Sequence, residues 1–140
     1  MPLNSSELAC FAAMTAESSS DNAVPLSQMG IDEFRTFAAA YAPRAGAMPD
    51  VAFVDREILT RDAAAIRLRI FNAHLATGPV LIFFPGNGYM NPLFEENAIA
   101  CGRIATNIKI KVILVEYRLA PEYPLPISIE DGFDALRAVV

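Results

Sequence analysis

The sequence predicts an α/β fold, in which helices cover a sheet with parallel strands at its centre. Residues 80–84 and 112–115 are continuous apolar runs, a pattern typical of parallel strands that are covered on both faces. Between these runs, residues 91–105 have the polar start and the single apolar face of an amphipathic helix. Strand, helix and strand in this order form a βαβ unit, so we expect helices on the faces of the sheet.

Length and composition favour a single globular domain. The chain has 140 residues, of which 54% are hydrophobic and 19% charged, and this composition excludes intrinsic disorder. The net charge is −5, which disfavours nucleic-acid binding because no basic stripe is available to neutralise phosphates. Cys10 and Cys101 form no CxxC pair, so we expect neither a disulfide scaffold nor a structural zinc site.

The N-terminal part is expected to contain short helices joined by a polar linker. Residues 8–14 are apolar, but Glu7 precedes them and no basic residue does. We therefore interpret them as an amphipathic helix of a cytoplasmic protein rather than as a signal peptide. Residues 17–27 are polar and turn-rich, which is typical of a linker. A second helix is predicted from Ile31, with apolar residues at helical spacing until Pro43.

An antiparallel pair of strands is predicted ahead of the βαβ unit. Val51 and Phe53 start the first strand at a period of two, and in the second strand three apolar residues at positions 66, 68 and 70 alternate with arginines. Such alternation predicts strands with one face in water, as at the edge of a sheet. Arg67 and Arg69 occupy the polar positions of the second strand, so we expect both to face solvent.

The two helices of the second half have recognisable start signals. Asn91 can cap the first of them, with Pro92 in its first turn. A final helix is predicted from Ser128, where residues 128–131 fit a capping box. Apolar residues at helical spacing predict the buried face of that helix: Ile129, Phe133, Leu136 and Val140. This periodicity runs to the last residue, so a further strand is expected to follow.

The turn after the first apolar run is the first candidate site. In residues 84–91, F-P-G-N-G-Y-M-N, two glycines flank an asparagine, so the backbone can turn sharply after a buried strand. Ligands of α/β sheets bind at such carboxyl ends of strands, where free N–H groups hold an oxyanion or a phosphate. The spacing alone leaves two interpretations open: a ligand-binding loop and a tight turn without function.

The second candidate is the proline-rich connection after the second apolar run. Residues 117–126 contain three prolines within six positions, and Arg118 can form an ion pair with Glu122 across this connection. Because exposed ion pairs contribute little to stability, structural stiffening is the favoured interpretation. We assign four residues to this structural turn: Tyr117, Arg118, Pro121 and Glu122.

Both segments resemble the hormone-sensitive-lipase-like carboxylesterases of the α/β-hydrolase fold. Residues 83–89, F-F-P-G-N-G-Y, are similar to the strand and HGGG segment of that family. Residues 116–126, E-Y-R-L-A-P-E-Y-P-L-P, followed by Glu130 and Asp131, resemble its D-Y-R-L-A-P-E…P-F-P…E-D block. This block is long, irregular and hard to match by chance. The resemblance covers residues from about 30 to 140.

The resemblance implies a partial α/β-hydrolase fold and the hydrolysis of small acyl esters. Residues 1–45 would form N-terminal cap helices and a linker. Residues 46–140 would form the first part of the core, with an antiparallel edge hairpin and two parallel buried strands with crossover helices. The resemblance assigns the oxyanion hole, which stabilises the tetrahedral intermediate through backbone N–H groups, to Gly86, Asn87 and Gly88.

Two residues of this loop depart from the family pattern. Pro85 stands where the family has histidine, and Asn87 where it has glycine. The first change removes a side chain that helps to fix the loop, and the second changes the backbone dihedral angles that the loop prefers. The N–H donors follow Pro85, so the oxyanion hole remains the prediction.

Ester hydrolysis requires residues that this sequence does not contain. The serine nucleophile of this fold lies in a G-x-S-x-G elbow, followed by an acid and a histidine, and none of the seven glycines belongs to such a motif. The one histidine, His74, is expected in a surface loop, and Cys101 on a buried helix face. No metal site and no cofactor are expected. We therefore expect a chain truncated ahead of the serine and inactive by itself.

A free strand edge is a further consequence of the resemblance. In the family's sheet, the strand at residues 80–84 pairs on one side with residues 112–115 and on the other with the strand that carries the serine. Without that strand the edge has unpaired backbone groups, which favour self-association or the docking of a complementing chain. A non-catalytic interaction protein that uses this edge is therefore the second hypothesis.

A dinucleotide-binding module is the third hypothesis. Gly86-x-Gly88-x-x-Asn91 follows a strand and opens a helix, and Glu116 ends the next strand, where a ribose-binding acid would lie. However, Asn91 replaces the third glycine of that motif and Pro92 follows it. The proline-rich connection also has no role in that fold, so this hypothesis is the weakest.

Overall fold

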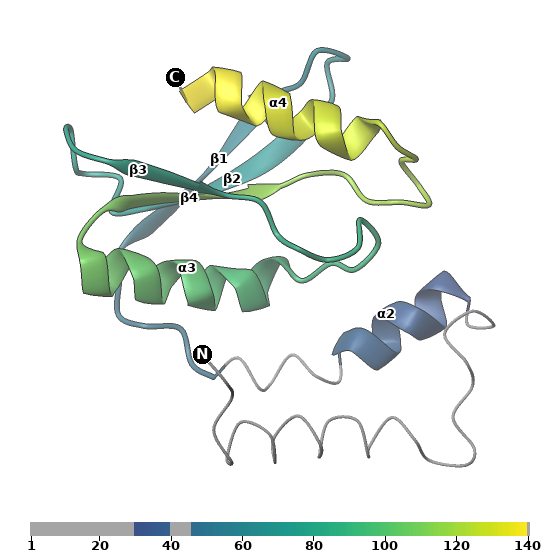
Figure 1. Ribbon diagram of the computed structural model, residues 1–140, viewed down its shortest axis with the longest axis horizontal. Coiled ribbons are helices and arrows are strands. Elements are labelled where there is room, and N and C mark those ends of the chain that lie inside the picture. Colours follow the sequence, from purple (N-terminus) through teal and green to yellow (C-terminus); the bar gives the residue numbers. More distant parts are fainter. Residues whose placement is uncertain (1–29, 40–45, 140) are drawn as a thin grey trace, which may run out of the picture. The chain divides into compact units, whose positions relative to one another are not determined.

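The computed structural model describes residues 30–39 and 46–139 (Figure 1). Its contacts divide the chain into two units, Met1–Gly30 and Ile31–Val140, and every described helix and strand belongs to the second unit. The helix and the linker predicted ahead of Ile31 lie outside the described residues. The division into cap helices up to residue 45 and a core after it stays a prediction.

The described residues form a sheet of four strands in the order β1-β2-β4-β3 (Figure 1). The strands are β1 (Phe53–Leu59), β2 (Ala65–Phe71), β3 (Val80–Phe83) and β4 (Lys111–Glu116). β1 pairs antiparallel with β2, and β2 with β4, whereas β3 and β4 are parallel, with Ile82 opposite Ile113. These pairings confirm both the edge hairpin and the parallel pair predicted from the sequence.

Helices cover both faces of this sheet. The helices of the described part of the chain are α2 (Ile31–Ala39), α3 (Phe94–Ile108) and α4 (Ile127–Val139), and the last two cover the sheet. Helix α3 connects the parallel strands β3 and β4 and lies on one face, while α4 lies on the other face (Figure 1). The predicted α/β fold class is therefore confirmed.

Each face of the sheet has its own hydrophobic core. Buried residues on the α3 side are Phe71, Phe94, Ala98, Cys101, Ala105, Val112 and Leu114. Those on the α4 side are Ile66, Leu68, Ile113, Val115, Tyr117 and Ala135. Strand β4 contributes alternate residues to both cores, which explains its continuous apolar run. Strand β3 lies at the end of the sheet, and Val80 is 49% exposed. Leu81 and Phe83 nevertheless pack against the first core and Ile82 against the second. Cover on both faces is therefore confirmed for both strands, and β3 is the less buried of the two.

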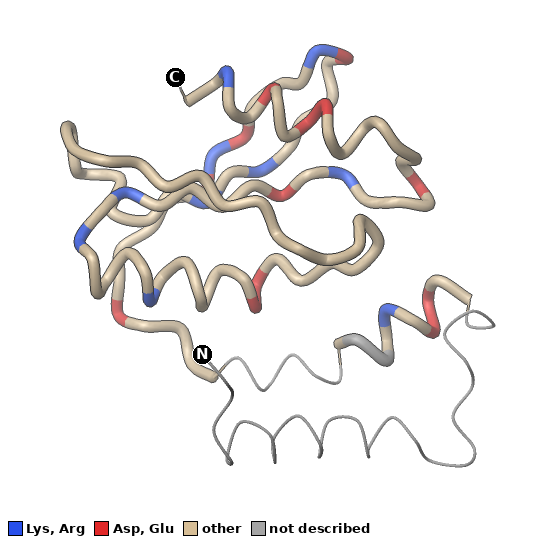
Figure 2. Tube along the Cα trace, in the orientation of Figure 1, with Lys and Arg blue, Asp and Glu red and all other residues tan. Residues whose placement is uncertain are grey.

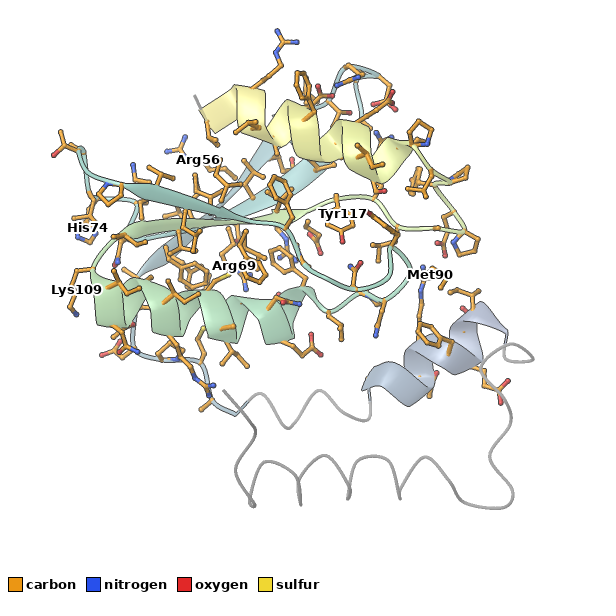
Figure 3. All side chains as sticks on the ribbon, viewed as in Figure 1. Arg56, Arg69, His74, Met90, Lys109 and Tyr117 are labelled. Carbon is orange, nitrogen blue, oxygen red and sulfur yellow. The ribbon has the colours of Figure 1, made fainter. Side chains whose placement is uncertain are left out.

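The polar face of β2 is covered by α3, and the prediction that it faces solvent was wrong. The side chain of Arg69 is buried between the sheet and α3 (Figure 3). Its guanidinium binds Asp55 at 2.7 Å and Glu95 at 2.6 Å. The guanidinium groups of Arg69 and Arg67 lie 5.1 and 4.2 Å from the ring centre of Phe94. Arginine fits such a site because its flat cation stacks on an aromatic ring while carboxylates neutralise its charge.

Helix α4 faces the sheet with a different side from the one predicted. Its buried residues are Ser128, Asp131, Asp134 and Ala135, whereas Ile129, Phe133 and Leu136 are 57%, 53% and 42% exposed. Charge pairing explains this orientation, because Asp131 binds Arg118 at 2.6 Å and Asp134 binds Arg61 at 3.0 Å. Val140 lies outside the described residues.

The predicted start signals of α3 and α4 were also wrong. Helix α3 has Leu93 as its N-cap residue, without a side-chain cap, and Asn91 lies in the preceding turn, where its N–H donates to the carbonyl of Asn87 at 3.2 Å. Ser128 lies inside α4 and not ahead of it, and its buried Oγ has no hydrogen-bond partner among the residues described. Ser128 therefore forms no capping box.

Candidate functional site

The loop that follows β3 reverses direction within a few residues. Pro85 is buried directly after the strand. Gly88 and Tyr89 both have a φ of +62°, a left-handed conformation that glycine adopts freely and tyrosine rarely. The hydrogen bond from Asn91 to Asn87 closes the turn. The sharp turn predicted from the two glycines is therefore present.

A pocket of about 630 Å³ opens beside this loop. The loop residues that line it are Phe84, Pro85, Gly86, Asn87, Gly88 and Tyr89. The other lining residues are Tyr117 and, from α4, Ser128, Ile129, Gly132, Phe133 and Leu136. Helix and loop approach closely, since a Cβ on Gly132 would lie 3.3 Å from the ring of Phe84. The outward apolar stripe of α4 is thus a wall of this pocket.

Three successive backbone N–H groups in the pocket wall have no acceptor within the described residues. They belong to Gly86, Asn87 and Gly88, whereas the next N–H, of Tyr89, donates to Oδ1 of Asn87 at 2.9 Å. Adjacent unpaired N–H groups form a concentrated positive potential that attracts an anion. The structure therefore brings the three residues of the expected oxyanion hole to the pocket, and their role there stays a prediction.

Tyr117 joins the two candidate segments. Its side chain is 8% exposed, and its hydroxyl contacts the carbonyl oxygen of Pro85 and, at 2.7 Å, Oδ1 of Asn87. Figure 3 shows Tyr117 beyond the end of β4, beside the loop that follows β3. Burial, with a smaller contribution from Tyr89, raises the pKa of the Tyr117 hydroxyl above its ordinary value. The hydroxyl therefore keeps its proton at neutral pH and acts as a donor.

Arg35 joins helix α2 to both candidate loops. Its guanidinium donates to the carbonyl oxygens of Met90 at 2.9 Å and Ala120 at 3.1 Å. It also forms a two-pronged ion pair with Glu122, at 2.6 and 2.8 Å. Hydrogen bonding to Arg35 lowers the pKa of Glu122 to about 2. Nothing in the sequence indicated this contact, because the two partners are 87 residues apart.

Arg118 does not pair with Glu122, so that prediction was wrong. The backbone N–H and the guanidinium of Arg118 both bind the fully buried carboxylate of Asp131, at 2.9 and 2.6 Å. The guanidinium also binds Asp62 at 2.8 Å and lies 5.2 Å from the ring centre of Tyr123. Hydrogen bonds from Arg118 hold the pKa of Asp62 well below its usual range. These contacts support a structural role for Arg118.

The remaining residues of the proline-rich connection lie at the surface. Pro121 and Glu122 are exposed, and the peptide bond between Ala120 and Pro121 is cis. Glu116, which the dinucleotide hypothesis assigns to a ribose, binds Arg67 at 2.7 Å. That carboxylate is therefore already engaged in an ion pair.

Other residues with nucleophilic or basic side chains lie away from the pocket. His74 is exposed in the loop after β2, at the opposite end of the sheet from Tyr117 (Figure 3). Cys101 is buried in α3, and this burial raises the pKa of its thiol to about 11. Among the residues described, no group of three His, Cys, Asp or Glu could hold a metal ion. No helix in the same residues is long and apolar enough to cross a membrane.

Known proteins share these features. Residues 81–140 match a family model described as the α/β hydrolase fold. An ethyl acetate hydrolase of Pseudomonas putida is 27% identical over all of this chain, and the esterase LipI of Mycobacterium tuberculosis is 34% identical over 69% of it. The chain is thus similar in sequence to α/β-hydrolase esterases. The family resemblance of the two sequence motifs is therefore confirmed.

A solved structure agrees with the fold. An esterase of the archaeon Pyrobaculum calidifontis superimposes on 99% of this chain with a TM-score of 0.77 at 24% identity. The described sheet and helices are thus part of an α/β-hydrolase fold. This chain covers 44% of that structure and 46% and 31% of the two sequence relatives. It therefore spans less than half the length of the esterases that it matches.

Proposed function

We propose that this chain supplies the oxyanion-binding loop of a carboxylic ester hydrolase. The observation that supports this proposal is the row of N–H groups of Gly86, Asn87 and Gly88, which have no acceptor in the described part of the chain and line an apolar pocket. In ester hydrolysis the carbonyl oxygen becomes negatively charged when a nucleophile adds to the carbon. N–H donors fixed in advance stabilise that charge, and most strongly where water is excluded.

The pocket favours a small acyl ester as the substrate. Phe84, Ile129 and Phe133 offer an apolar wall to an acyl or alcohol group, which is stabilised there by the burial of apolar surface. The carbonyl oxygen of the same ester would lie against the N–H groups of the loop. The reaction proposed needs no metal ion and no cofactor.

The nucleophile must come from another polypeptide segment, since this sequence has no G-x-S-x-G motif. We infer that such a segment, with the serine, acid and histidine, pairs with the open edge of β3. Among the described strands, β3 pairs with β4 on one side and has no partner on the other. The chain alone is expected to be inactive, and its cytoplasmic location stays a prediction from the sequence.

Complementation tests this function. We would co-express the chain with the part of the Pseudomonas putida relative that lies outside the aligned region, and measure hydrolysis of p-nitrophenyl butyrate. We expect activity from the pair and none from either part alone. Activity of the chain alone would contradict the proposal, and so would a folded complex of the two parts that is inactive.

Self-association through the same edge is a second candidate function, and the composition of β3 favours it. Its sequence, Val-Leu-Ile-Phe, has no charged residue (Figure 2), whereas natural edge strands are usually protected by charges. Exposed apolar side chains of α4 also line the pocket beside the loop that follows β3. Two copies could therefore pair their β3 strands without repulsion between charges.

Sedimentation of two matched variants tests self-association. Val80→Glu places a charge on the edge strand β3, where the side chain of Val80 is half-exposed. Leu59→Glu places the same charge on β1 at the other edge, where Leu59 is 74% exposed. We expect the wild type and L59E to form dimers or larger species and V80E to be monomeric. A monomeric wild type would contradict the proposal.

A further inference from the structure

Backbone hydrogen bonds fix only the second half of the candidate loop, where the carbonyl oxygen of Asn87 accepts the N–H of Asn91 at 3.2 Å. Gly86, Asn87 and Gly88 donate no backbone hydrogen bond to any described residue, and Pro85 has no N–H to donate. Packing does not fix Gly86 either, because a Cβ placed there would meet no atom within 4 Å. The carbonyl of Asn87 sets the direction of the Gly88 N–H in the same planar peptide unit. Some other contact must hold the N–H groups of Gly86 and Asn87 in place.

The side chain of Asn87 makes one such contact. Its Oδ1 accepts the N–H of Tyr89 at 2.9 Å. An asparagine that accepts the N–H two residues further on forms an Asx turn, in which the side chain takes the place of a backbone carbonyl. The bond stabilises the left-handed conformation of Tyr89 and uses none of the three N–H groups that precede it.

Tyr117 makes the second contact, from the other side of the loop. Its hydroxyl lies against the carbonyl oxygen of Pro85 and against Oδ1 of Asn87. A hydroxyl has one hydrogen to donate, so two acceptors that bracket Gly86 converge on one donor. Tyr117 is itself fixed, because it belongs to the buried core on the α4 side of the sheet.

The planarity of the peptide bond then sets the direction of the first N–H. The peptide unit between Pro85 and Gly86 is trans, so its carbonyl and its N–H point in opposite directions. The carbonyl points at the hydroxyl of Tyr117. The N–H of Gly86 therefore points away from Tyr117, where no acceptor of the described chain meets it.

We propose that Asn87 and Tyr117 are positioning residues, which together hold the N–H groups of Gly86 and Asn87 unpaired and in a fixed direction. This inference rests on the proposed function of the loop. Asn87 acts only as an acceptor in these contacts, through Oδ1. An aspartate at this position would accept the same two hydrogen bonds, whereas alanine would accept neither.

Residue-resolved amide hydrogen exchange and ¹⁵N relaxation of the full chain test the proposal. In N87A we expect the amide of Tyr89 to exchange about five- to tenfold faster, the effect of losing one hydrogen bond, and the amides of Gly86 and of residue 87 to become more mobile. N87D should keep the wild-type exchange rates. Y117F should keep the Tyr89 bond and make the amide of Gly86 more mobile.

Two matched controls separate loop positioning from general stability. N97A removes an asparagine that binds the carbonyl of Leu93 at 2.6 Å at the start of α3, and Y123F removes a hydroxyl from a half-exposed tyrosine. Neither should change the amides of Gly86 and Asn87, even where the thermal midpoint falls as much as in N87A. Unchanged amides in both N87A and Y117F, or an N87D chain that behaves like N87A, would overturn the proposal.

These measurements also distinguish this inference from the proposed function. Complementation that fails while the amides respond as expected would remove the ester-hydrolase function and leave the positioning roles of Asn87 and Tyr117. Complementation that succeeds while the amides do not respond would support the ester-hydrolase function and remove the positioning roles of Asn87 and Tyr117.

Discussion

The two faces of the sheet are covered in different ways. Under α3, small apolar residues are fully buried, among them Ala98, Cys101 and Ala105, and the helix hides the face that its periodicity predicts. Helix α4 has the same apolar spacing, yet Ile129 and Phe133 face outward. One helix closes a core, and the other leaves an apolar wall beside the candidate loop.

Charged residues account for this difference. Asp131 and Asp134 on the inner side of α4 each bind an arginine from another element. Separating a buried carboxylate from its cationic partner destabilises the fold by several kcal/mol. The burial of one further apolar side chain stabilises the fold by less than this. Charge pairing can therefore decide which face of a helix is buried, and the apolar stripe is left to line a pocket.

The largest expected effect on stability distinguishes the core under α3 from the outward apolar residues of α4. Phe71→Ala should lower the free energy of unfolding by about 3–5 kcal/mol, because Phe71 is fully buried in the core under α3. Ile129→Ala on the outer side of α4 should lower it by less than about 0.5 kcal/mol. Urea unfolding measures both. Equal losses in the two variants would show that the two faces do not differ as described.

A somewhat smaller effect is expected for the charge pair that orients α4. Arg118→Ala leaves the buried carboxylate of Asp131 without its cation and should cost about 3 kcal/mol. Arg137→Ala, an exposed arginine at the end of the same helix, is the control and should cost less than about 0.5 kcal/mol. Unfolding curves that coincide for the two variants would exclude charge pairing as the cause of the α4 orientation.

The smallest effect concerns the ion pair of α2 and depends on pH. The pKa of Glu122 is lowered from 4.5 to about 2 by hydrogen bonding to Arg35, so the charged pair stabilises the fold above pH 4.5. This stabilisation should be lost progressively as the pH falls towards 2. The thermal midpoint of E122Q should therefore lie below that of the wild type at pH 7, and the two should converge near pH 2. A difference that is independent of pH would contradict this assignment.

Much of the fold could be predicted from the sequence because its signals are local. Alternation in β2 and the continuous apolar run of β4 each reflect the neighbours of one strand. The burial of Arg69 and the orientation of α4 could not be predicted in this way. They depend on ion pairs such as Arg69 with Glu95, whose partners are 26 residues apart in the chain.

The candidate site also combines local features, which the sequence predicts, with contacts between distant residues, which it does not. The turn at residues 86–88 and the segment around Tyr117 have motifs that a single sequence reveals. The contact of Tyr117 with Pro85 and Asn87, and that of Arg35 with Glu122, arise only when the loops meet in the fold. No periodicity or motif marks such contacts between loops.

The most direct test of the central claim is a pair of substitutions at Gly86 in the complemented enzyme. G86P removes the first N–H of the loop, whereas G86A keeps it and adds a Cβ that meets no atom within 4 Å. We expect kcat for p-nitrophenyl butyrate to be about 100- to 1,000-fold lower in G86P than in G86A, the usual effect of removing one oxyanion-hole donor. Equal rates in the two variants would contradict the claim that these N–H groups stabilise the oxyanion.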